Sequence, residues 1–428
     1  MCGAPWRNDF RSEPVDRLQL IQNWIPHLKS LGVTAVYIGP LWESSSHGYD
    51  TVSYFDPDRR LGSHVSLQHL IWVLHENGLK VVLDAVLNHV SRDFFAFRSV
   101  RQHLQRSPYY SWFENLSFKS RNKRGDPFQY EGWKGHDDLV KLNLQHPDVQ
   151  QHLFEALRQW IKYYGIDGLR LDAADCMDKA FLKSLKAFGR KLRPDFWMMG
   201  EVVMGDYRDW QLDSITNYEL YDSLHKAHNT RDYRRLAQTL ERQYGKSGVY
   251  RNLPLYNFLD NHDVNRIASL LRRHAHLYPA HILLFSLPGI PSLYYGSEAG
   301  LEGKRLKFSD RPLRPFLPHP DALKTARHPD LLKSVQKLIQ IRRSEAALRQ
   351  GDYQTLFCDE DCLVFVRRWQ HECLIVAVNG SREVRRFELP AAWRGHSWQD
   401  RLNAESLHNP QELVLYPHWG RILKRQNT

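Results

Sequence analysis

Near-continuous apolar runs alternate with segments of helical periodicity over most of the chain. The runs at 33–39 (VTAVYIG) and 79–86 (LKVVLDAV) are typical of strands that a parallel sheet buries on both faces. Residues 14–32 and 66–77 carry apolar side chains at helical spacing, and Gly78 marks the end of the second helix. Strand and helix units of this length predict a parallel sheet or barrel.

The alternation resumes after a long interval. A helix is predicted near 148–164, and the strand at 166–172 (IDGLRLD) follows it. Further strands are predicted, with helical segments between them, at residues 196–201, 214–219, 255–260 and 291–296. The count is seven strands, one fewer than a (β/α)8 TIM barrel contains. No segment before residue 33 has a strand pattern, so the first barrel strand is missing from the prediction.

Charged residues lie where several of these strands end. Arg170 and Asp172 share one face of their strand, because side chains alternate along a strand. A structural Arg–Asp pair is an equal alternative for these two residues alone, since buried charges must be paired. Five of the seven predicted strands, however, end at or near a carboxylate, namely Asp84, Asp172, Glu201, Glu219 and Asp260. A doubly wound sheet binds ligands at one switch point, so acids on many strands favour a barrel.

Two parts of the chain predict additional domains. The interval 90–146, after the strand at 79–86 that would be the third of a barrel, is too long for a βα loop and contains several aromatic residues. After residue 345 the pattern changes to short alternating strands, at 363–367, 373–378, 384–389 and 413–416. We therefore expect a barrel at 1–345, a small inserted domain at 90–146 and a C-terminal antiparallel β-sandwich at 346–428.

Charge and cysteine content limit which binding partners and which cellular compartment we expect. The net charge of +11 raises nucleic acid as a partner. Only residues 119–124 (KSRNKR) form a compact basic cluster, however, so we expect a solvated loop and no nucleic acid. The five cysteines are odd in number and lack metal-ligand spacing, which suits a reducing compartment. No signal peptide opens the chain, and proline and glycine interrupt the longest apolar run, 282–295. We expect a cytoplasmic protein without a membrane span, and we leave a homodimer open.

Four motifs follow one another at the predicted strand ends. They are DAVLNH at 84–89, GLRLD at 168–172, Gly200-Glu201 and FLDNHD at 258–263, with flanking segments at 32–40 and 139–144. In this order they resemble the conserved regions of glycoside hydrolase family 13, the α-amylase family. The resemblance extends from about residue 16 to the end, and is strongest to the neopullulanase, cyclomaltodextrinase and maltogenic amylase branch. It implies a (β/α)8 barrel with an inserted domain and a C-terminal β-sandwich.

The resemblance also implies that three acids perform the chemistry. Asp172 matches the nucleophile that forms a covalent glycosyl intermediate, and Glu201 matches the general acid that protonates the leaving oxygen and then activates water. Crowding by Asp172 and Asp263 would help Glu201 to hold its proton. Asp263 matches the carboxylate that binds sugar hydroxyls and favours a distorted ring. Three unpaired carboxylates at three buried strand ends would be costly without such a function.

Five further residues match sugar-binding or supporting positions of the family, namely Tyr49, Asp84, His89, Arg170 and His262. The two histidines match those that hydrogen-bond the sugar in the −1 subsite, and the tyrosine matches the aromatic platform beneath that sugar. The arginine would keep Asp172 ionised and aimed, and Asp84 would support the arginine. Outside a motif, a lone histidine or tyrosine at such a place is more often structural.

Two of the matched regions depart from the family pattern. The second region often ends in Lys-His, which contacts the sugar beyond the cleavage point, whereas this chain has Asp175-Cys176. Many members bind calcium through an aspartate and an asparagine; Asn88 is present here, but Lys141 occupies the aspartate position. An ammonium group repels a divalent cation that requires oxygen ligands. We therefore expect neither a metal nor another cofactor.

The sequence thus predicts a retaining glycoside hydrolase that cleaves mainly α-1,4 bonds of short malto-oligosaccharides or cyclodextrins. An α-glucosidase or a glycosyltransferring enzyme of the same fold is the alternative within the class, because water and sugar acceptors compete for one intermediate. A catalytically silent barrel that binds partners or acts as a scaffold is the alternative outside it. Such proteins lose the acidic residues, whereas this chain keeps all three.

Overall fold

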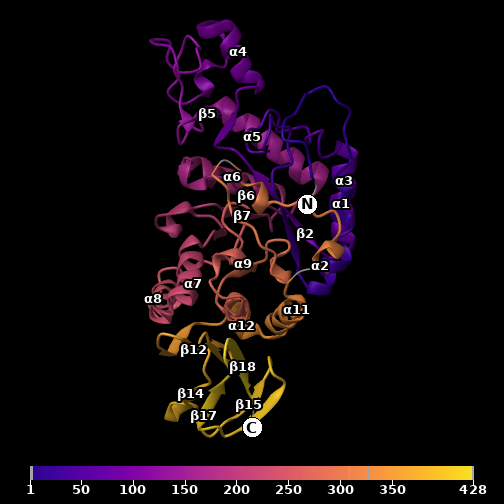
Figure 1. The fold of residues 1–428 in the computed structure, drawn as a ribbon. Helices are drawn as coiled ribbons and strands as arrows, with labels where there is room; N and C mark the ends of the chain where they lie inside the picture. The colour runs from indigo at the N-terminus through magenta and orange to yellow at the C-terminus, as the bar shows by residue number, and fades with distance from the viewer. Residues whose placement is uncertain (1–2, 308, 325–326, 427–428) are drawn as a thin grey trace. The chain divides into compact units, whose positions relative to one another are not determined.

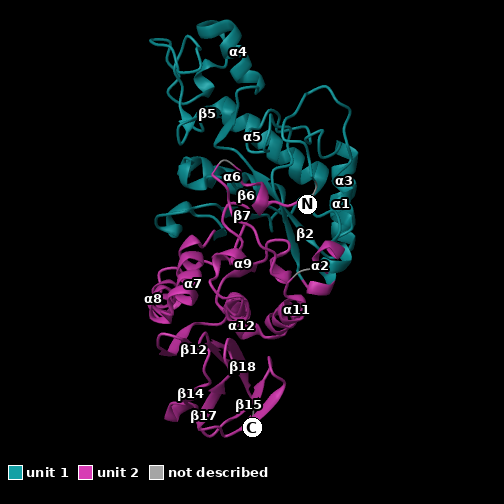
Figure 2. Ribbon diagram, in the orientation of Figure 1, with its two compact units in different colours: residues 1–29, 33–215, 316–319 teal, residues 30–32, 216–315, 320–428 magenta. Residues whose placement is uncertain are grey.

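The computed structural model describes residues 3–307, 309–324 and 327–426 (Figure 1). The chain divides into two compact units (Figure 2). Unit 1 consists of residues 1–29, 33–215 and 316–319, and unit 2 of residues 30–32, 216–315 and 320–428. The strands predicted for the barrel are therefore shared between the two units.

A five-stranded parallel sheet is the main feature of unit 1. Its strands pair in chain order and are β1 (Ala35–Ile38), β2 (Lys80–Ala85), β6 (Gly168–Leu171), β7 (Trp197–Gly200) and β8 (Ser214–Ile215). Their buried apolar side chains include Val81, Leu83, Leu169 and Met198. The register pairs Asp84 with Arg170, and Leu171 with Gly200. The carboxyl ends of β2, β6 and β7, which carry the predicted site residues, therefore lie side by side in the sheet.

Helices precede and connect these strands, as the sequence predicted. They are α1 (Gln19–Gln22), α2 (Ile25–Leu31), α3 (His64–Glu76), α5 (Pro147–Gln159), which continues into a π-helical turn at Trp160–Tyr164, and α6 (Lys179–Leu192). The helix expected at 14–32 is found as two short pieces, α1 and α2. At the start of α3, Ser63 and Ser66 form a capping box. Gly78 follows this helix at φ +74°, the left-handed conformation that glycine adopts most easily.

The interval after β2 forms a small antiparallel sheet of three strands in the order β3 (His89–Ser91), β5 (His136–Lys141), β4 (Gly132–Trp133). The helix α4 (Phe95–His103) accompanies it. Aromatic rings fill its interior: the ring centroid of Phe97 lies 5.1 Å from that of Phe113 and 4.9 Å from that of Tyr130. The boundaries expected for an inserted domain, 90–146, stay a prediction.

Unit 2 contains two strands that pair in parallel, β9 (Tyr256–Phe258) and β10 (Ile290–Ser292). Its helices are α7 (Tyr218–Thr230), α8 (Tyr233–Tyr244), α9 (Ile267–Leu270), α10 (Leu277–Ser286), α11 (Pro329–Ser344) and α12 (Ala346–Gln350). The described residues hold seven parallel strands in the two units, and β1 is the first of them. Within that part of the chain, every helix is too short or too polar to cross a membrane.

The start of α7 corrects one prediction. The strand expected at 214–219 ends at Ile215, and Glu219 lies in the first turn of α7 rather than at a strand end. There it pairs with Arg242 and accepts a hydrogen bond from Gln243. A carboxylate in the first turn is stabilised by the helix dipole, so Glu219 has a structural explanation and is not part of the predicted acidic site.

The C-terminal residues form a β-sandwich, as predicted. A six-stranded antiparallel sheet has the order β11 (Gln354–Cys358), β12 (Cys362–Trp369), β13 (Glu372–Asn379), β18 (Trp419–Arg425), β15 (Ser397–Asp400), β16 (Glu405–His408). β14 (Arg385–Glu388) pairs with β17 (Glu412–Leu415). The two sheets share one apolar core, to which β14 contributes Phe387 and β17 contributes Leu413 and Leu415. The sequence predicted β12, β13, β14 and β17 and missed the other four strands.

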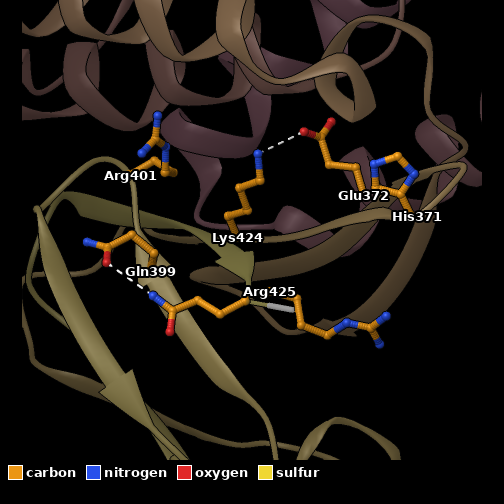
Figure 3. A pocket seen from close by; sticks show the side chains of 7 residues that line it. His371, Glu372, Gln399, Arg401, Lys424 and Arg425 are labelled. Atoms are coloured by element: carbon orange, nitrogen blue, oxygen red, sulfur yellow. Dashed lines mark hydrogen bonds and ion pairs between the residues drawn. The ribbon is translucent and has the colours of Figure 1, made fainter. Parts of the chain in front are cut away.

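A polar cavity of about 460 Å³ lies beside β15 and β18 (Figure 3). Lys424 donates to Glu345 at 2.6 Å and to Glu372 at 3.0 Å, and Arg401 pairs with the buried Glu345 at 2.8 Å. Glu372 also accepts a hydrogen bond from the amide of Ala347, in the first turn of α12. These contacts attach α12 to the C-terminal sheet, so the lining of this cavity has a structural explanation.

Candidate active site

The strand ends of unit 1 bring the predicted acids to one arginine. Arg170 lies on β6 and is 3% exposed. Its Nη1 is 3.0 Å from Asp84 Oδ1 and 2.7 Å from Asp172 Oδ1, and its Nη2 is 2.7 Å from Glu201 Oε1. Asp84 belongs to β2, Asp172 follows β6 and Glu201 follows β7. Carboxyl groups at the ends of three strands therefore share one guanidinium, and Asp172 and Glu201 both contact it.

Two glycines of the motifs are required by close packing. A Cβ atom on Gly168 would lie 2.5 Å from the carbonyl oxygen of Trp197, on the neighbouring strand. A Cβ atom on Gly200 would lie 2.5 Å from Leu212 Cδ1 and 3.0 Å from Ala174 Cβ. Gly168 thus lets β6 and β7, the strands that precede Asp172 and Glu201, approach this closely, and Gly200 leaves room for the side chains of Leu212 and Ala174.

The backbone after Asp172 links the two acids. Ala173 has φ +49°, in the left-handed region that a non-glycine residue rarely adopts. In this conformation its amide donates to Glu201 Oε2 at 3.2 Å. The strained residue thus orients the carboxyl group of Glu201.

The charge balance around Asp172 differs from the simplest expectation. Burial raises the pKa of Asp172 well above its ordinary value; Glu201 and Asp84 add to the rise, and Arg170 opposes it. The sequence-based expectation that Arg170 keeps Asp172 ionised accounts for only one of these effects. Burial and the two neighbouring acids thus oppose the ionisation of Asp172, and Arg170 favours it.

Asp84 is held by two tyrosines as well as by Arg170. Tyr49, the predicted platform, donates its hydroxyl to Asp84 Oδ2 at 3.3 Å, and Tyr37 on β1 donates to the same oxygen at 2.6 Å. Burial raises the pKa of Tyr37 well above its ordinary value, so it remains a donor. Sequence reasoning missed Tyr37 because a tyrosine within an apolar strand gives no sign of an acidic partner on the next strand.

His89 lies on β3, and its side chain is buried beside the nucleophile candidate. Its Nε2 is 4.0 Å from Asp172 Oδ2 and, within the described structure, has no hydrogen-bond partner. Burial lowers the pKa of His89 to about 3, so the ring is neutral. The ring of Trp133, from β4, stacks on it at a centroid distance of 5.3 Å. Sequence reasoning named Trp133 only as one of the aromatic residues of the insertion.

The two predicted residues of unit 2 form a separate group that follows β9. His262 Nε2 is 3.0 Å from Asp263 Oδ2. Arg314 donates to Asp263 Oδ1 at 3.0 Å and to the carbonyl oxygen of His262 at 3.2 Å. Arg314 was missed, because nothing near it in the sequence marks it as a partner of FLDNHD. Asp260, in contrast, is buried and accepts hydrogen bonds from Ser297 and the Ile267 amide at 2.8 Å, so it is structural.

At the position where the family resemblance implies a calcium ligand, this protein has Lys141, whose side chain is itself a cation. Lys141 Nζ is 2.7 Å from Glu131 Oε1, and the amide of Asn88 lies 3.1 Å from His89 Nδ1. Across the described ranges, no group of three or more histidine, cysteine, aspartate or glutamate side chains is arranged to hold a metal ion. The residues present therefore do not fit a calcium ion at this position.

Acids gathered on one arginine at the ends of parallel strands place the protein in the class of barrel-type glycosidases. Comparison with known proteins gives the particular family. The model of the α-amylase catalytic domain matches residues 15–314. The chain belongs to the α-amylase family.

Relatives with known names agree. The chain is 31% identical to neopullulanase 2 of Thermoactinomyces vulgaris over 93% of its length, and 30% identical to a cyclomaltodextrinase of a Bacillus species over 85%. It spans 69% and 66% of the length of these two relatives. Among solved structures, a cyclomaltodextrinase superposes with a TM-score of 0.84 at 26% identity, covering 99% of this chain and 74% of that one.

A further solved structure is the cyclic α-maltosyl-(1→6)-maltose hydrolase of Arthrobacter globiformis. It superposes with a TM-score of 0.81 at 25% identity, covering 99% of this chain and 93% of that one. The family and the branch inferred from the motifs are therefore confirmed, as is the fold of a barrel followed by a β-sandwich. The interpretation as an α-glucan-acting glycosidase is confirmed at the level of the family.

Proposed function

We propose that this protein is a retaining α-glucan-acting glycoside hydrolase. Its substrates would be short malto-oligosaccharides or cyclodextrins, cleaved mainly at α-1,4 bonds. The observation that carries the proposal is the pair Asp172 and Glu201 on one guanidinium. Retaining enzymes need two carboxyl groups roughly 5–5.5 Å apart, without room for a water molecule between them. Two acids that share Arg170 suit that requirement.

The reaction would proceed in two displacements. An oxygen of ionised Asp172 attacks the anomeric carbon while the glycosidic C–O bond breaks, and Glu201 gives its proton to the leaving oxygen. Water then attacks the same carbon, Glu201 takes a proton from that water, and the bond to Asp172 breaks. Each displacement inverts the carbon, so the α configuration is retained.

The remaining predicted residues would bind the sugar. Tyr49 would lie beneath the −1 glucosyl ring, and the free Nε2 of His89 would hydrogen-bond one of its hydroxyl groups. His262 and Asp263 would bind sugar hydroxyl groups, and Asp263 would favour the distorted, oxocarbenium-like form of the ring. Arg314 orients Asp263 for this role. No step requires a metal ion, and we propose that the protein has none.

A chromatogram of products tests the proposal. Purified protein is incubated with maltotriose, β-cyclodextrin, pullulan, sucrose and trehalose, with Asp172→Asn as the matched blank. We expect hydrolysis of the first two and none by the variant. Longer products from maltotriose would favour the glycosyltransferring alternative, and release of glucose alone from the chain ends would favour an α-glucosidase. No turnover of any substrate would favour the silent binding protein.

The cellular compartment, the oligomeric state and the lack of nucleic-acid binding are also proposals. We propose a cytoplasmic protein: the cysteines at 176, 358, 362 and 373 are free, and the relatives include an intracellular maltogenic amylase of Bacillus subtilis. Sedimentation in the presence and absence of DNA tests the assembly: we expect no binding of DNA, and the measurement decides whether the protein is a monomer or the homodimer that the sequence leaves open.

A further inference from the structure

Three aromatic rings of unit 1 form a row that begins at the predicted sugar platform. The ring centroid of His47 lies 6.0 Å from that of Tyr49, with an angle of 31° between the planes. The ring centroid of Trp6 lies 5.9 Å from that of His47, at an angle of 48°. Tyr49 contacts Asp84 through its hydroxyl. The row therefore leads from the acidic cluster to the N-terminal segment.

Exposure to solvent increases along this row. Asp84 is fully buried, the His47 side chain is 28% exposed, and Trp6 is 46% exposed. A single exposed apolar side chain is common on any protein surface. Trp6 differs because its ring continues a row that starts at the candidate active site.

The segment that carries Trp6 is held in place by a buried charge. Arg60 is 9% exposed and pairs with Asp58 at 2.5 Å. Its Nη1 donates to the carbonyl oxygens of Pro5, Trp6 and Ser46, at 3.1, 2.9 and 2.7 Å. One guanidinium thus joins the segment of Trp6 to the loop that carries His47 and Tyr49. The backbone at Trp6 is thus held in place before any ligand binds, which lowers the entropic cost of binding.

The contacts of Arg170 indicate on which side of the cleaved bond this row lies. Asp84 is bound by Nη1 of Arg170, whereas Glu201, the general-acid candidate, is bound by Nη2. Tyr49 thus contacts an acid held by Nη1, whereas the general-acid candidate, on whose side the leaving sugar would lie, is held by Nη2. A glucan chain that crosses Tyr49 would reach His47 and Trp6 with its non-reducing part.

We propose that Trp6, together with His47, forms an additional binding subsite for a glucosyl unit on the non-reducing side of the −1 sugar. Glucosyl rings have apolar C–H faces that pack against flat aromatic side chains, and binding sites combine such faces with a few polar groups. This inference rests on the proposed function and adds to it a preference for chains long enough to reach Trp6.

Trp6→Ala tests the subsite by its dependence on chain length. With maltoheptaose we expect kcat/KM to fall about tenfold, mainly through KM, which corresponds to the loss of one stacking contact. With 4-nitrophenyl α-glucoside, whose single sugar cannot reach Trp6, we expect a change of less than about twofold. Trp6→Phe should keep most of the activity on maltoheptaose, because it keeps a flat ring.

The matched control is Trp72→Ala, since Trp72 is another exposed tryptophan of unit 1, 56% exposed, on α3. This variant should leave kcat/KM unchanged on both maltoheptaose and 4-nitrophenyl α-glucoside. Equal loss of activity on both substrates by Trp6→Ala would indicate a structural role and overturn the subsite, as would an unchanged ratio between them.

Binding to an inactive background separates this inference from the proposed function. Calorimetry with maltoheptaose compares Asp172→Asn with the double variant that also carries Trp6→Ala. A loss of affinity of about tenfold supports the subsite even if the wild-type protein hydrolyses nothing, in which case only the proposed function fails. Equal affinity of the two variants, or no binding of maltoheptaose by either, overturns the subsite.

Discussion

Arg170 is the side chain on which the geometry of the acidic cluster depends. Its fork of donors meets Asp84, Asp172 and Glu201 at 2.7–3.0 Å. Lysine keeps the charge but cannot reproduce the fork. We expect Arg170→Lys to reduce kcat on maltotriose at least about a hundredfold, because the loss of one preorganised donor typically lowers kcat by about that factor. The circular dichroism spectrum of the variant should be unchanged.

The control for this variant is Arg158→Lys. Arg158 is half exposed and pairs with exposed Glu155 at 3.0 Å on a helix surface, where an ion pair contributes little. It should leave kcat unchanged. Full activity of Arg170→Lys would mean that the acids are positioned by something other than the guanidinium.

Lys141 leads to a prediction about metal dependence. Because its ammonium group pairs with Glu131 at the position where the family resemblance implies a calcium ligand, we expect removal of metal ions to have no effect. We expect the same rate and the same Tm before and after dialysis against EDTA. A calcium-dependent amylase treated in parallel confirms that the dialysis works. Inhibition that added calcium reverses would contradict this prediction.

Single residues were predictable from the sequence where a local motif carried them. Asp84, Arg170 and Asp172 lie in two short motifs, and the structure brings them into contact. Trp133 and Arg314 were not predictable in this way. Their contacts join segments far apart in the chain, and neither residue belongs to a motif that names its partner.

The packing of β7 makes Gly200 a sensitive position. An added methyl group would lie 2.5 Å from Leu212 Cδ1 and 3.0 Å from Ala174 Cβ, directly before Glu201. We expect Gly200→Ala to lower the free energy of unfolding by about 1–3 kcal/mol, as overpacking does, and to lower kcat about tenfold or more by displacing Glu201. Urea unfolding and steady-state kinetics measure both.

Gly39→Ala is the matched control, because the space around Gly39 is open and its backbone needs no left-handed φ. Its stability and kcat should stay close to those of the wild type. If Gly200→Ala were equally harmless, the close approach of β7 to its neighbours would not determine where Glu201 lies.

The helix α10 carries a buried histidine that should make stability depend on pH. Burial lowers the pKa of His281 to about 4 from its ordinary value of 6.5. Between pH 6.5 and pH 4, the unfolded chain therefore binds a proton at His281 that the folded protein does not bind. The stabilising contribution is complete above pH 6.5 and is lost as the pH falls toward 4, by about 1.4 kcal/mol per pH unit.

His281→Leu removes this titration from the core of unit 2. Urea unfolding of the variant between pH 6.5 and pH 4 should show a slope of stability against pH that is smaller by about 1.4 kcal/mol per unit. Two proteins with the same slope would show that His281 does not titrate differently in the folded and unfolded states.

Elements were predictable where their pattern was strong. The apolar strands β2, β6 and β7 were found in the sequence, since a parallel sheet buries both of their faces. β1 was found by the same apolar pattern, although its residues are only partly buried or exposed. The start of α7 was mistaken for a strand end, because a helix with an acidic first turn and a strand followed by an acid have similar local patterns. β15 and β18 carry a charged side chain at a buried position, Asp400 and Arg421, and this buried ion pair breaks their apolar alternation. β16 is short and mostly polar.

The order of the domains follows from the sequence, whereas the approach of remote segments does not. The change to short alternating strands after residue 345 was sufficient to predict the β-sandwich. The N-terminal segment shows no regular pattern, so nothing predicted that Arg60 would hold Trp6 beside His47. Contacts of this kind depend on the folded molecule and not on local periodicity.

The central claim for the whole molecule is that Asp172 forms a covalent bond to the sugar during turnover. Mass spectrometry of the protein, digested after reaction with a slowly hydrolysed 5-fluoro-α-glucosyl fluoride, tests it most directly. We predict a peptide containing Asp172 that is heavier by one fluoroglucosyl unit, and no such peptide from Asp172→Asn. Turnover without any labelled peptide, or a label on Glu201 or Asp263, would contradict the account.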